Sequence, residues 1–244
     1  MKAVKTVKPR LAATVTILRE GGSGGFEVLL LKRSDELAFA PGKWVFAGGK
    51  AEPEDFKGVS SELEGLRNAG LREALEETGL NVTGPLDYFM EFTTPGNGIK
   101  FQTSFFVALV EPGQQVIVDG SEIIDHQWQS AEMFLEGFRN NRYSLMVPTG
   151  LTLMRLAMAE SLQEARAALA APPHFNVKPE LHILDDGTKI TSFLGDELHS
   201  AHANDGLSNC IHRCLFDQEM DSWRYVHSTD EERFPRIDGG YTQR

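Results

Sequence analysis

The sequence predicts an α/β fold with a mixed sheet and helices on its faces, followed by a C-terminal β-rich appendage. Residues 1–171 show the order strands, helix, strands, helices, which is typical of a mixed sheet covered by helices. The pair Pro172-Pro173 then interrupts this pattern, and residues 172–244 carry hairpin signals instead. The later segment is too small and polar to bury a good core alone, so we expect it to pack on the first domain or on a second subunit.

Strands and loops are predicted at the start of the chain. Residues 12–20 (AATVTILRE) are β-branched and partly alternating, and residues 26–33 (FEVLLLKR) form a near-continuous apolar run. Both are expected as strands that form a hairpin around the Gly-rich turn at 21–25. Residues 44–47 (WVFA) are expected as a short strand that runs into Gly48-Gly49, and the polar residues after it as a loop.

A helix is predicted to follow and to end at Thr78. Ser60 or Ser61 can cap its first turn. Gly79 can adopt the left-handed conformation that ends a helix. The apolar residues expected on its buried side are Leu63, Leu66, Leu71, Ala74 and Leu75.

The remaining elements follow from the same patterns. The expected elements up to the proline pair are strands at 86–94 and 99–110, a short strand at 116–118, an acidic loop at 119–125, an edge strand at 126–129, a helix capped by Ser130 that runs to Phe138, and one longer helix from Pro148 to Ala170. In the appendage, Asp185-Asp186-Gly187 between two apolar runs predicts a hairpin. A further strand is expected at 211–216 or at 223–227.

Composition excludes several classes of protein. A formal net charge of −11 repels phosphate backbones, so we expect no nucleic-acid partner and no acidic membrane surface. A small anionic substrate is compatible with this charge if metal ions screen it locally. Two cysteines imply no disulfide framework. The sequence shows no secretion signal, no C-terminal peroxisomal tag and no apolar run near the roughly 18 residues of a membrane span, so a cytoplasmic enzyme is expected.

The chemistry is concentrated in residues 71–80 (LREALEETGL). At about 100° per residue, Glu73, Glu76 and Glu77 return to one face of the predicted helix and repel one another. They also occupy its last turns, where the helix dipole disfavours negative charge. A bound divalent cation would reverse both penalties, because hard cations take oxygen ligands. The alternative is a solvated acidic face.

Together, Gly48-Gly49 and the segment REALEETG resemble the Nudix box. The second half of the box matches from Arg72 onward, but its first half fits two registers. In one register Gly58 and Glu64 fill the glycine and acidic positions at the literal spacing. In the other Gly49 and Asp55 fill them, which implies an insertion within the box. We favour the second register, because backbone must approach metal and phosphate at the strand end.

The order of segments around the box resembles one subgroup of the Nudix family. These are the coenzyme A diphosphatases of the Nudix motif 19 type and their bacterial relatives, in which the box contains an insertion. The resemblance covers roughly residues 10–165 and departs at Ala47, where many relatives have proline. It implies an α/β/α sandwich. The upstream signature of coenzyme A-specific members is not evident, so the resemblance does not define the substrate.

The resemblance also implies a set of site residues. Glu73, Glu76 and Glu77, with the Gly48 carbonyl, would bind Mg²⁺ or Mn²⁺, and Arg72 would pair with a box glutamate. A water activated by the metal would attack a diphosphate, with a general base either from the box (Glu76) or from the later loop (Glu122). Weaker candidates for substrate contact are Arg33, Gly49, Lys50 and Phe101.

The function that we expect is hydrolysis of a diphosphate linkage in a nucleoside-diphosphate-linked small molecule. Coenzyme A, ADP-ribose and nucleotide sugars are the candidate substrates. The alternatives are a catalytically inactive Nudix-fold nucleotide-binding or sensor domain and a plain helical interaction module. Many Nudix enzymes are dimers, so a homodimer is compatible with the resemblance.

Overall fold

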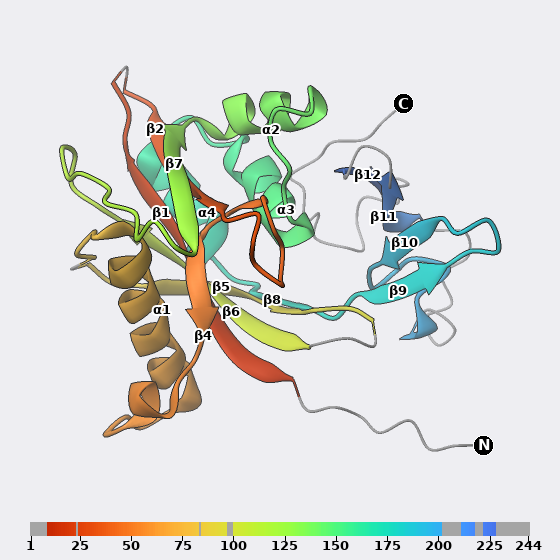
Figure 1. The fold of residues 1–244 in the computed structure, drawn as a ribbon, viewed down its shortest axis with the longest axis horizontal. Helices are drawn as coiled ribbons and strands as arrows, with labels where there is room; N and C mark the ends of the chain where they lie inside the picture. The colour runs from red at the N-terminus through yellow and green to blue at the C-terminus, as the bar shows by residue number, and fades with distance from the viewer. Residues whose placement is uncertain are drawn as a thin grey trace.

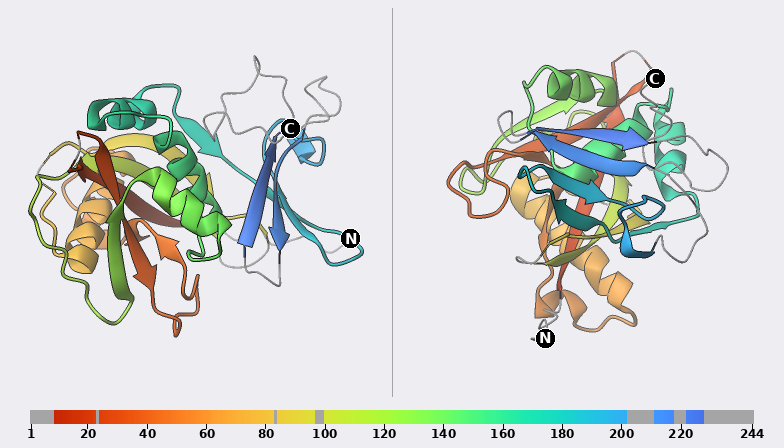
Figure 2. Two further views of the ribbon diagram at one scale, coloured as in Figure 1. Left: turned by 90° about the horizontal axis from the view of Figure 1, so that it is seen from above. Right: turned by 90° about the vertical axis from the view of Figure 1, so that its right-hand side faces the viewer.

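The computed structural model describes residues 9–22, 24–82, 84–96, 100–201, 211–217 and 222–227. Within these residues the chain forms a mixed sheet of eight strands, which helices cover, and a second antiparallel sheet of four strands (Figure 1). The second sheet lies beside the main sheet, at the end of the molecule away from α1 (Glu62–Thr78) (Figure 2). This confirms the predicted α/β class with additional C-terminal strands.

The strand at the centre of the main sheet is β1 (Arg10–Glu20). One edge of it, from Arg10 to Leu18, pairs in parallel with β6 (Phe101–Leu109). Its other edge pairs antiparallel with β2 (Phe26–Arg33) at one end and with β4 (Ala47–Lys50) at the other. The predicted hairpin of β1 and β2 is therefore confirmed, and β1 connects the two halves of the sheet.

The two glycines lie within a strand, which corrects the expectation that they follow one. The segment expected as one strand is divided into β3 (Trp44–Val45) and β4, and Gly48 and Gly49 pair with Thr14 and Ala13 of β1. A Cβ atom at Gly48 would lie 2.4 Å from the carbonyl oxygen of Ala13 and 2.7 Å from Thr14 Cα. A side chain at Gly48 would therefore force this pair of strands apart.

Helix α1 begins and ends where the sequence predicts. The Ser61 hydroxyl accepts a hydrogen bond from the Glu64 N–H, and Gly79 ends the helix at φ 67°. Leu66 and Ala74 are buried against the sheet as expected, but Leu75 is 53% exposed. The expectation for Leu75 was wrong, because the face defined by residues 66, 70, 74 and 77 points at the sheet.

The polar stretch before α1 also differs from the predicted loop. It contains a short 3₁₀ helix, η1 (Pro53–Phe56). The Asp55 carboxylate accepts a hydrogen bond from the Glu52 N–H at 2.8 Å, which closes the first turn of η1. Asp55 is buried as a result, at 7% exposure.

Most of the later elements match the prediction. Two strands are found close to their expected positions, β5 (Asp87–Thr93) and β6, and helix α2 (Ala131–Arg139) begins after Ser130. Strand β7 (Ile123–Gln129) begins three residues earlier than expected and pairs with β2. Residues 116–118 form no strand, because the Ile117 N–H bonds to the last turn of α1, at the Thr78 carbonyl.

The long helix expected from Pro148 to Ala170 is divided in two. The structure has α3 (Val147–Leu156) and α4 (Leu162–Ala170) instead. The Ser161 hydroxyl accepts a hydrogen bond from the Glu164 N–H and so begins a new helix. The periodic apolar pattern runs through the break, which is why it suggested one helix.

The C-terminal strands belong to both sheets. The first, β8 (Phe175–Val177), pairs in parallel with β5 of the main sheet. The expected hairpin is formed by β9 (Glu180–Ile183) and β10 (Lys189–Ser192). Both candidate segments for a further strand are strands, β11 (His212–Asp217) and β12 (Ser222–His227), and the order is β12-β11-β10-β9.

The two faces of the main sheet carry separate hydrophobic cores. The core under α1 includes Val15 and Leu66, whereas Leu18 and Val28 face the core on the other side. This second core also contains Trp223 from the C-terminal sheet. The C-terminal strands therefore share a core with α2 and α3. No helix in the described part of the chain is long and apolar enough to cross a membrane.

A hydrogen bond from a buried tryptophan fixes the second sheet to the first domain. Trp223 Nε1 donates to the Leu145 carbonyl at 2.8 Å, and its ring lies 5.0 Å from that of Phe138. We predict that Trp223→Phe lowers the free energy of unfolding by about 1 kcal/mol more than Trp128→Phe, measured by urea denaturation. Trp128 is the matched control, because its buried Nε1 has no hydrogen-bond partner among the described residues. Equal losses would show that the Trp223 bond contributes nothing.

Candidate functional site

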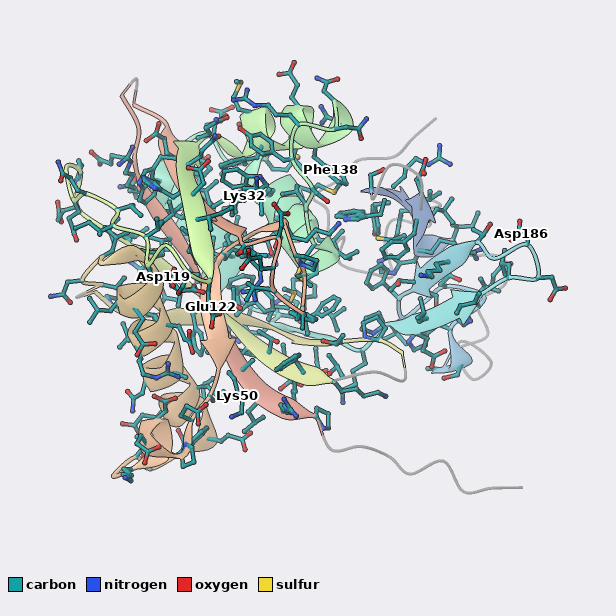
Figure 3. All side chains as sticks on the ribbon, in the orientation of Figure 1. Lys32, Lys50, Asp119, Glu122, Phe138 and Asp186 are labelled. Carbon is teal, nitrogen blue, oxygen red and sulfur yellow. The ribbon has the colours of Figure 1, made fainter. Side chains whose placement is uncertain are left out.

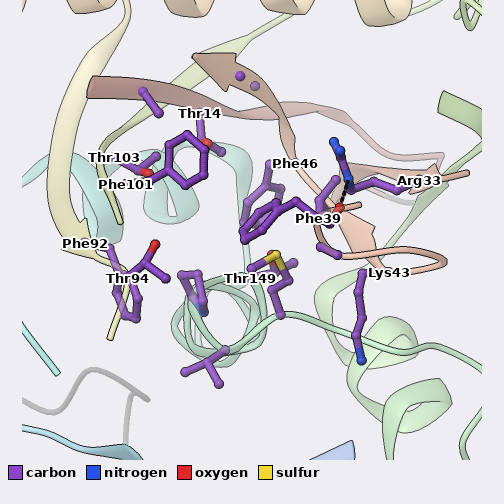
Figure 4. Close-up of a pocket in the computed structure, with 18 of the residues that line it drawn as sticks. Thr14, Arg33, Phe39, Lys43, Phe46, Phe92, Thr94, Phe101, Thr103 and Thr149 are labelled. Atoms are coloured by element: carbon purple, nitrogen blue, oxygen red, sulfur yellow. Dashed lines mark hydrogen bonds between the residues drawn. The ribbon is translucent and has the colours of Figure 1, made fainter. Parts of the chain in front are cut away.

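A cavity of about 1050 Å³ lies between α1, β4, the loop before β3, the start of α3 and the C-terminal sheet. Figure 4 shows part of its lining, with aromatic side chains from several strands. All the site residues predicted from the sequence line this cavity except Arg72, namely Arg33, Gly48, Gly49, Lys50, Glu73, Glu76, Glu77, Phe101 and Glu122. The fold therefore brings together residues that are far apart in the sequence.

Arg72 lies beside the cavity and contacts three carboxylates. Its guanidinium donates two hydrogen bonds to Asp55, at 3.0 and 3.1 Å, and one each to Glu73 at 2.8 Å and Glu76 at 3.1 Å. A further bond at 3.1 Å reaches the Lys50 carbonyl. These contacts raise the pKa of Arg72, chiefly through Asp55. Arg72 thus joins η1, β4 and α1 and fixes the direction of two glutamates.

The same contacts favour one register of the box. Asp55 is buried, and although burial raises the pKa of its carboxyl, hydrogen bonds from Arg72 and the Glu52 N–H outweigh this and lower the pKa overall. Glu64 is exposed and bonds to the Ser60 N–H and hydroxyl at 2.9 Å. It stabilises the start of α1 and lies outside the cavity lining. The geometry supports Asp55 as the acidic residue of the first half.

Glu77 is the buried carboxylate of the cluster. It is 7% exposed and accepts a hydrogen bond from the Gly48 N–H at 2.9 Å. Burial raises its pKa to about 8, and the neighbouring charges of Glu73 and Glu122 act in the same direction. Burial likewise raises the pKa of Glu73. Crowded, partly desolvated carboxylates of this kind gain from a nearby cation.

The donor set fits a hard divalent cation by its chemistry. Carboxylate and carbonyl oxygens suit Mg²⁺ and Mn²⁺. In the described residues no three acidic, histidine or cysteine side chains are arranged to hold an ion. Instead, Glu73 and Glu76 accept hydrogen bonds from Arg72, and Glu77 accepts one from the Gly48 N–H. Binding a cation would therefore require these side chains to exchange partners.

Gly49 explains how Glu73 approaches the strand so closely. A Cβ atom at Gly49 would lie 2.5 Å from the Glu73 carboxyl carbon and 2.6 Å from its oxygens. Any larger residue would displace this carboxylate. The glycine pair therefore has two roles, because Gly48 permits strand pairing and Gly49 admits a glutamate.

Glu122 lines the cavity from a loop that is held by hydrogen bonds to the Asp119 side chain. The Asp119 carboxylate accepts hydrogen bonds from the N–H groups of Ser121, Glu122 and Ile123. Burial raises the Asp119 pKa, but a hydrogen bond from the Ser121 hydroxyl, together with these backbone bonds, outweighs it and lowers the pKa to about 2. The Ser34 N–H donates a hydrogen bond to the Glu122 carbonyl at 2.8 Å. Figure 3 places Glu122 beside β4, close to the end of α1.

Several lining residues were not predicted from the sequence. Phe39, Phe46 and Phe92 line the cavity from three segments of the first domain. Thr191, Phe216 and Trp223 line it from the C-terminal sheet. No local motif marks these residues, because their positions depend on the path of the chain between them.

Comparison with known proteins identifies the family. The sequence model described as "NUDIX domain" matches residues 8–147, so the chain belongs to the Nudix family. A curated relative, peroxisomal coenzyme A diphosphatase ndx-8 of Caenorhabditis elegans, is 28% identical over 134 residues, which are 54% of this chain and 53% of the relative. Nudix hydrolase 15, mitochondrial, of Arabidopsis thaliana is 31% identical over 108 residues, 44% of this chain and 38% of the relative. The chain spans about half or less of these relatives' lengths.

A solved structure shows the same fold. The Nudix hydrolase from Alicyclobacillus acidocaldarius superposes with a TM-score of 0.62 at 21% identity. The match covers 69% of this chain and 100% of that structure. At this identity the likeness concerns the fold alone.

Replacing Asp55 tests its pairing with Arg72. We predict that Asp55→Asn lowers the free energy of unfolding at pH 7 by about 2 kcal/mol, because two charge-assisted bonds to a half-buried guanidinium are weakened. The folded-state pKa of Asp55 is lowered, so its contribution is present above the unfolded pKa of about 4 and is lost as pH falls below it. Urea denaturation at pH 7 and pH 3 measures both effects.

The matched control is Glu64→Gln on α1, the other candidate for the acidic position of the box. Glu64 is exposed, so this change should alter the free energy of unfolding little at either pH. If Glu64→Gln destabilises the protein as much as Asp55→Asn, the assignment of Asp55 to the box is wrong.

Proposed function

We propose that this chain is a divalent-metal-dependent hydrolase that cleaves a diphosphate linkage in a nucleoside-diphosphate-linked small molecule. The observation that carries the proposal is the cluster of Glu73, Glu76 and Glu77 at one end of a large cavity, organised by Arg72. Coenzyme A is one candidate substrate, because a relative is named a coenzyme A diphosphatase. ADP-ribose and nucleotide sugars are others.

The residues that would hold the metal are Glu73, Glu76, Glu77 and the Gly48 carbonyl. When bound, Mg²⁺ or Mn²⁺ would lower the pKa of a water and screen the diphosphate charge. The net charge of −11 makes such screening necessary for an anionic substrate. Arg72 holds Glu73 and Glu76 side by side at this end of the cavity, and both would exchange this partner for the cation.

Other residues of the chain have separate roles. Glu122 is the proposed general base, which accepts a proton from the attacking water, and the Asp119 turn holds its backbone in place. Arg33 and Lys50 line the cavity and are proposed to bind substrate phosphates. The ring centroids of Phe101 and Phe39 are 5.4 Å apart, and this pair is proposed to stack against a flat group of the substrate.

The alternative proposal is a Nudix-fold binding or sensor domain without catalysis. The intact set of Arg72 and the three glutamates favours the enzyme, since a binding domain has no need for all of them. A cytoplasmic location and a homodimer stay predictions. The two curated relatives are named peroxisomal and mitochondrial, so they do not support a cytoplasmic location.

Removing one carboxylate tests the metal ligands. We predict that Glu76→Gln lowers kcat about 100-fold or more, because an amide binds a hard cation far less well than a carboxylate. The measurement is formation of the two phosphate monoesters, separated by chromatography, from a panel of diphosphate-linked compounds with Mg²⁺ or Mn²⁺, and chelation with EDTA should abolish it. Glu64→Gln on the same helix is the control and should retain wild-type kcat. Turnover that persists in Glu76→Gln would refute the ligand assignment, and no turnover on any substrate would favour the binding domain.

A second substitution tests the general base. We predict that Glu122→Gln lowers kcat about 100-fold with little change in KM, because it removes the proton acceptor and leaves the loop intact. Asp125→Asn, on β7 and outside the cavity lining, is the control and should change neither constant. If kcat survives in Glu122→Gln, the base comes from the box.

A further inference from the structure

The C-terminal sheet forms one wall of the cavity. Thr191 on β10, Phe216 on β11 and Trp223 on β12 line it together with the glutamates of α1. Lys189, Asp217 and Ser222 of the same sheet also line the cavity. We call the first three residues, Thr191, Phe216 and Trp223, the far wall. All three lie beyond residue 147, where the match to the Nudix family ends. The cavity is therefore completed by a part of the chain outside the family domain.

The far wall is fixed in position. Trp223 bonds to the Leu145 carbonyl at 2.8 Å, and a Cβ atom at Gly150 would lie 2.4 Å from its indole ring. The segment from Leu145 to Thr149 also lines the cavity. Through Trp223, the C-terminal sheet is thus packed directly against the start of α3.

The far wall lies opposite the acidic end of the cavity. Figure 1 and the left view of Figure 2 show α1 and the β9–β12 sheet at opposite ends of the molecule. A diphosphate placed at the glutamates would direct one of its substituents toward the far wall. The cavity volume, about 1050 Å³, slightly exceeds the range of roughly 300–1,000 Å³ for small-molecule sites, so there is room for a bulky substituent.

The lining between the two ends combines several phenylalanines with threonines and the cationic residues Arg33 and Lys43. Phe39, Phe92 and Phe101 line the cavity (Figure 4). Phe216 is half-buried at the far wall. Flat apolar surfaces of this kind favour a group that is itself aromatic or largely apolar. A small or strongly hydrated substituent would leave these surfaces in water.

We propose that the far wall is a specificity-determining part of the substrate site, which binds a bulky, aromatic or largely apolar group attached to one phosphate of the diphosphate. This inference rests on the proposed function of the same cavity. It adds that residues outside the Nudix domain decide which diphosphates are accepted.

Binding of non-hydrolysable diphosphonates tests the far wall without turnover. The probes are two esters of methylenediphosphonate, one with a methyl group and one with a 4-phenylbutyl group, titrated by calorimetry in Mg²⁺. The wild type should bind the phenylbutyl ester about tenfold or more tightly than the methyl ester, because its chain buries apolar surface. Phe216→Ala should reduce this preference by about tenfold and leave the methyl ester within twofold of wild type.

The matched control is Ile183→Ala, which removes an exposed apolar side chain of the same sheet outside the cavity lining. Ile183→Ala should keep the wild-type preference for the phenylbutyl ester over the methyl ester. Phe216→Leu retains apolar volume and should reduce the preference less than Phe216→Ala, so it tests the wall even if the alanine variant fails to fold. The inference is overturned if the wild type shows no preference, if Phe216→Ala weakens both esters equally, or if Phe216 variants and Ile183→Ala behave alike.

Failure of the far wall and failure of the proposed function give different results. Hydrolysis that depends on Glu76, together with an unchanged ester preference in Phe216→Ala, would overturn the far wall alone. A preference that depends on Phe216, together with no hydrolysis of any diphosphate, would overturn the hydrolase and leave a binding site with a far wall.

Discussion

The contacts of the Arg72 guanidinium are the interaction on which the candidate site depends. One planar cation joins Asp55 of η1, the Lys50 carbonyl of β4, and Glu73 and Glu76 of α1. Without it, several carboxylates would face one another at a helix end whose dipole already disfavours them. Arg72 compensates part of this charge, and the glutamates that carry the rest line the cavity. The site is thus held together while it stays electronegative enough to attract a cation.

The central strand β1 imposes a second constraint. Its free edge beyond β2 is filled by β4, and this pairing is possible because Gly48 has no side chain to meet Ala13 and Thr14. Pairing with β1 also positions β4 so that the Gly48 N–H donates a hydrogen bond to the Glu77 carboxylate. The buried carboxylate is therefore positioned by the sheet as well as by its own helix. Strand pairing and site geometry depend on the same glycine.

The C-terminal sheet extends the domain and shares its core. Trp223 is buried among residues of α2 and α3, and β8 continues the main sheet beside β5. The proline pair at 172–173 marks a change in composition, yet the chain beyond it still contributes to the first sheet and to the cavity. This arrangement gives the Nudix domain of this chain a wall that the family match does not include.

The sequence by itself determined the elements whose signals are local. Ser61 and Gly79 mark the ends of α1, the spacing of Glu73, Glu76 and Glu77 places them together, and the motif from Arg72 onward identifies the family. These features depend on contacts within a few residues, which a sequence pattern records directly.

Only the tertiary structure decided the features that depend on distant contacts. Asp55 and Arg72 are 17 residues apart, and Leu145 and Trp223 are 78 apart, so no periodicity links either pair. Leu75 is exposed for a similar reason, because the sheet chooses which face of α1 is buried. The choice of Asp55 over Glu64 and the existence of the far wall both follow from how the chain folds back on itself.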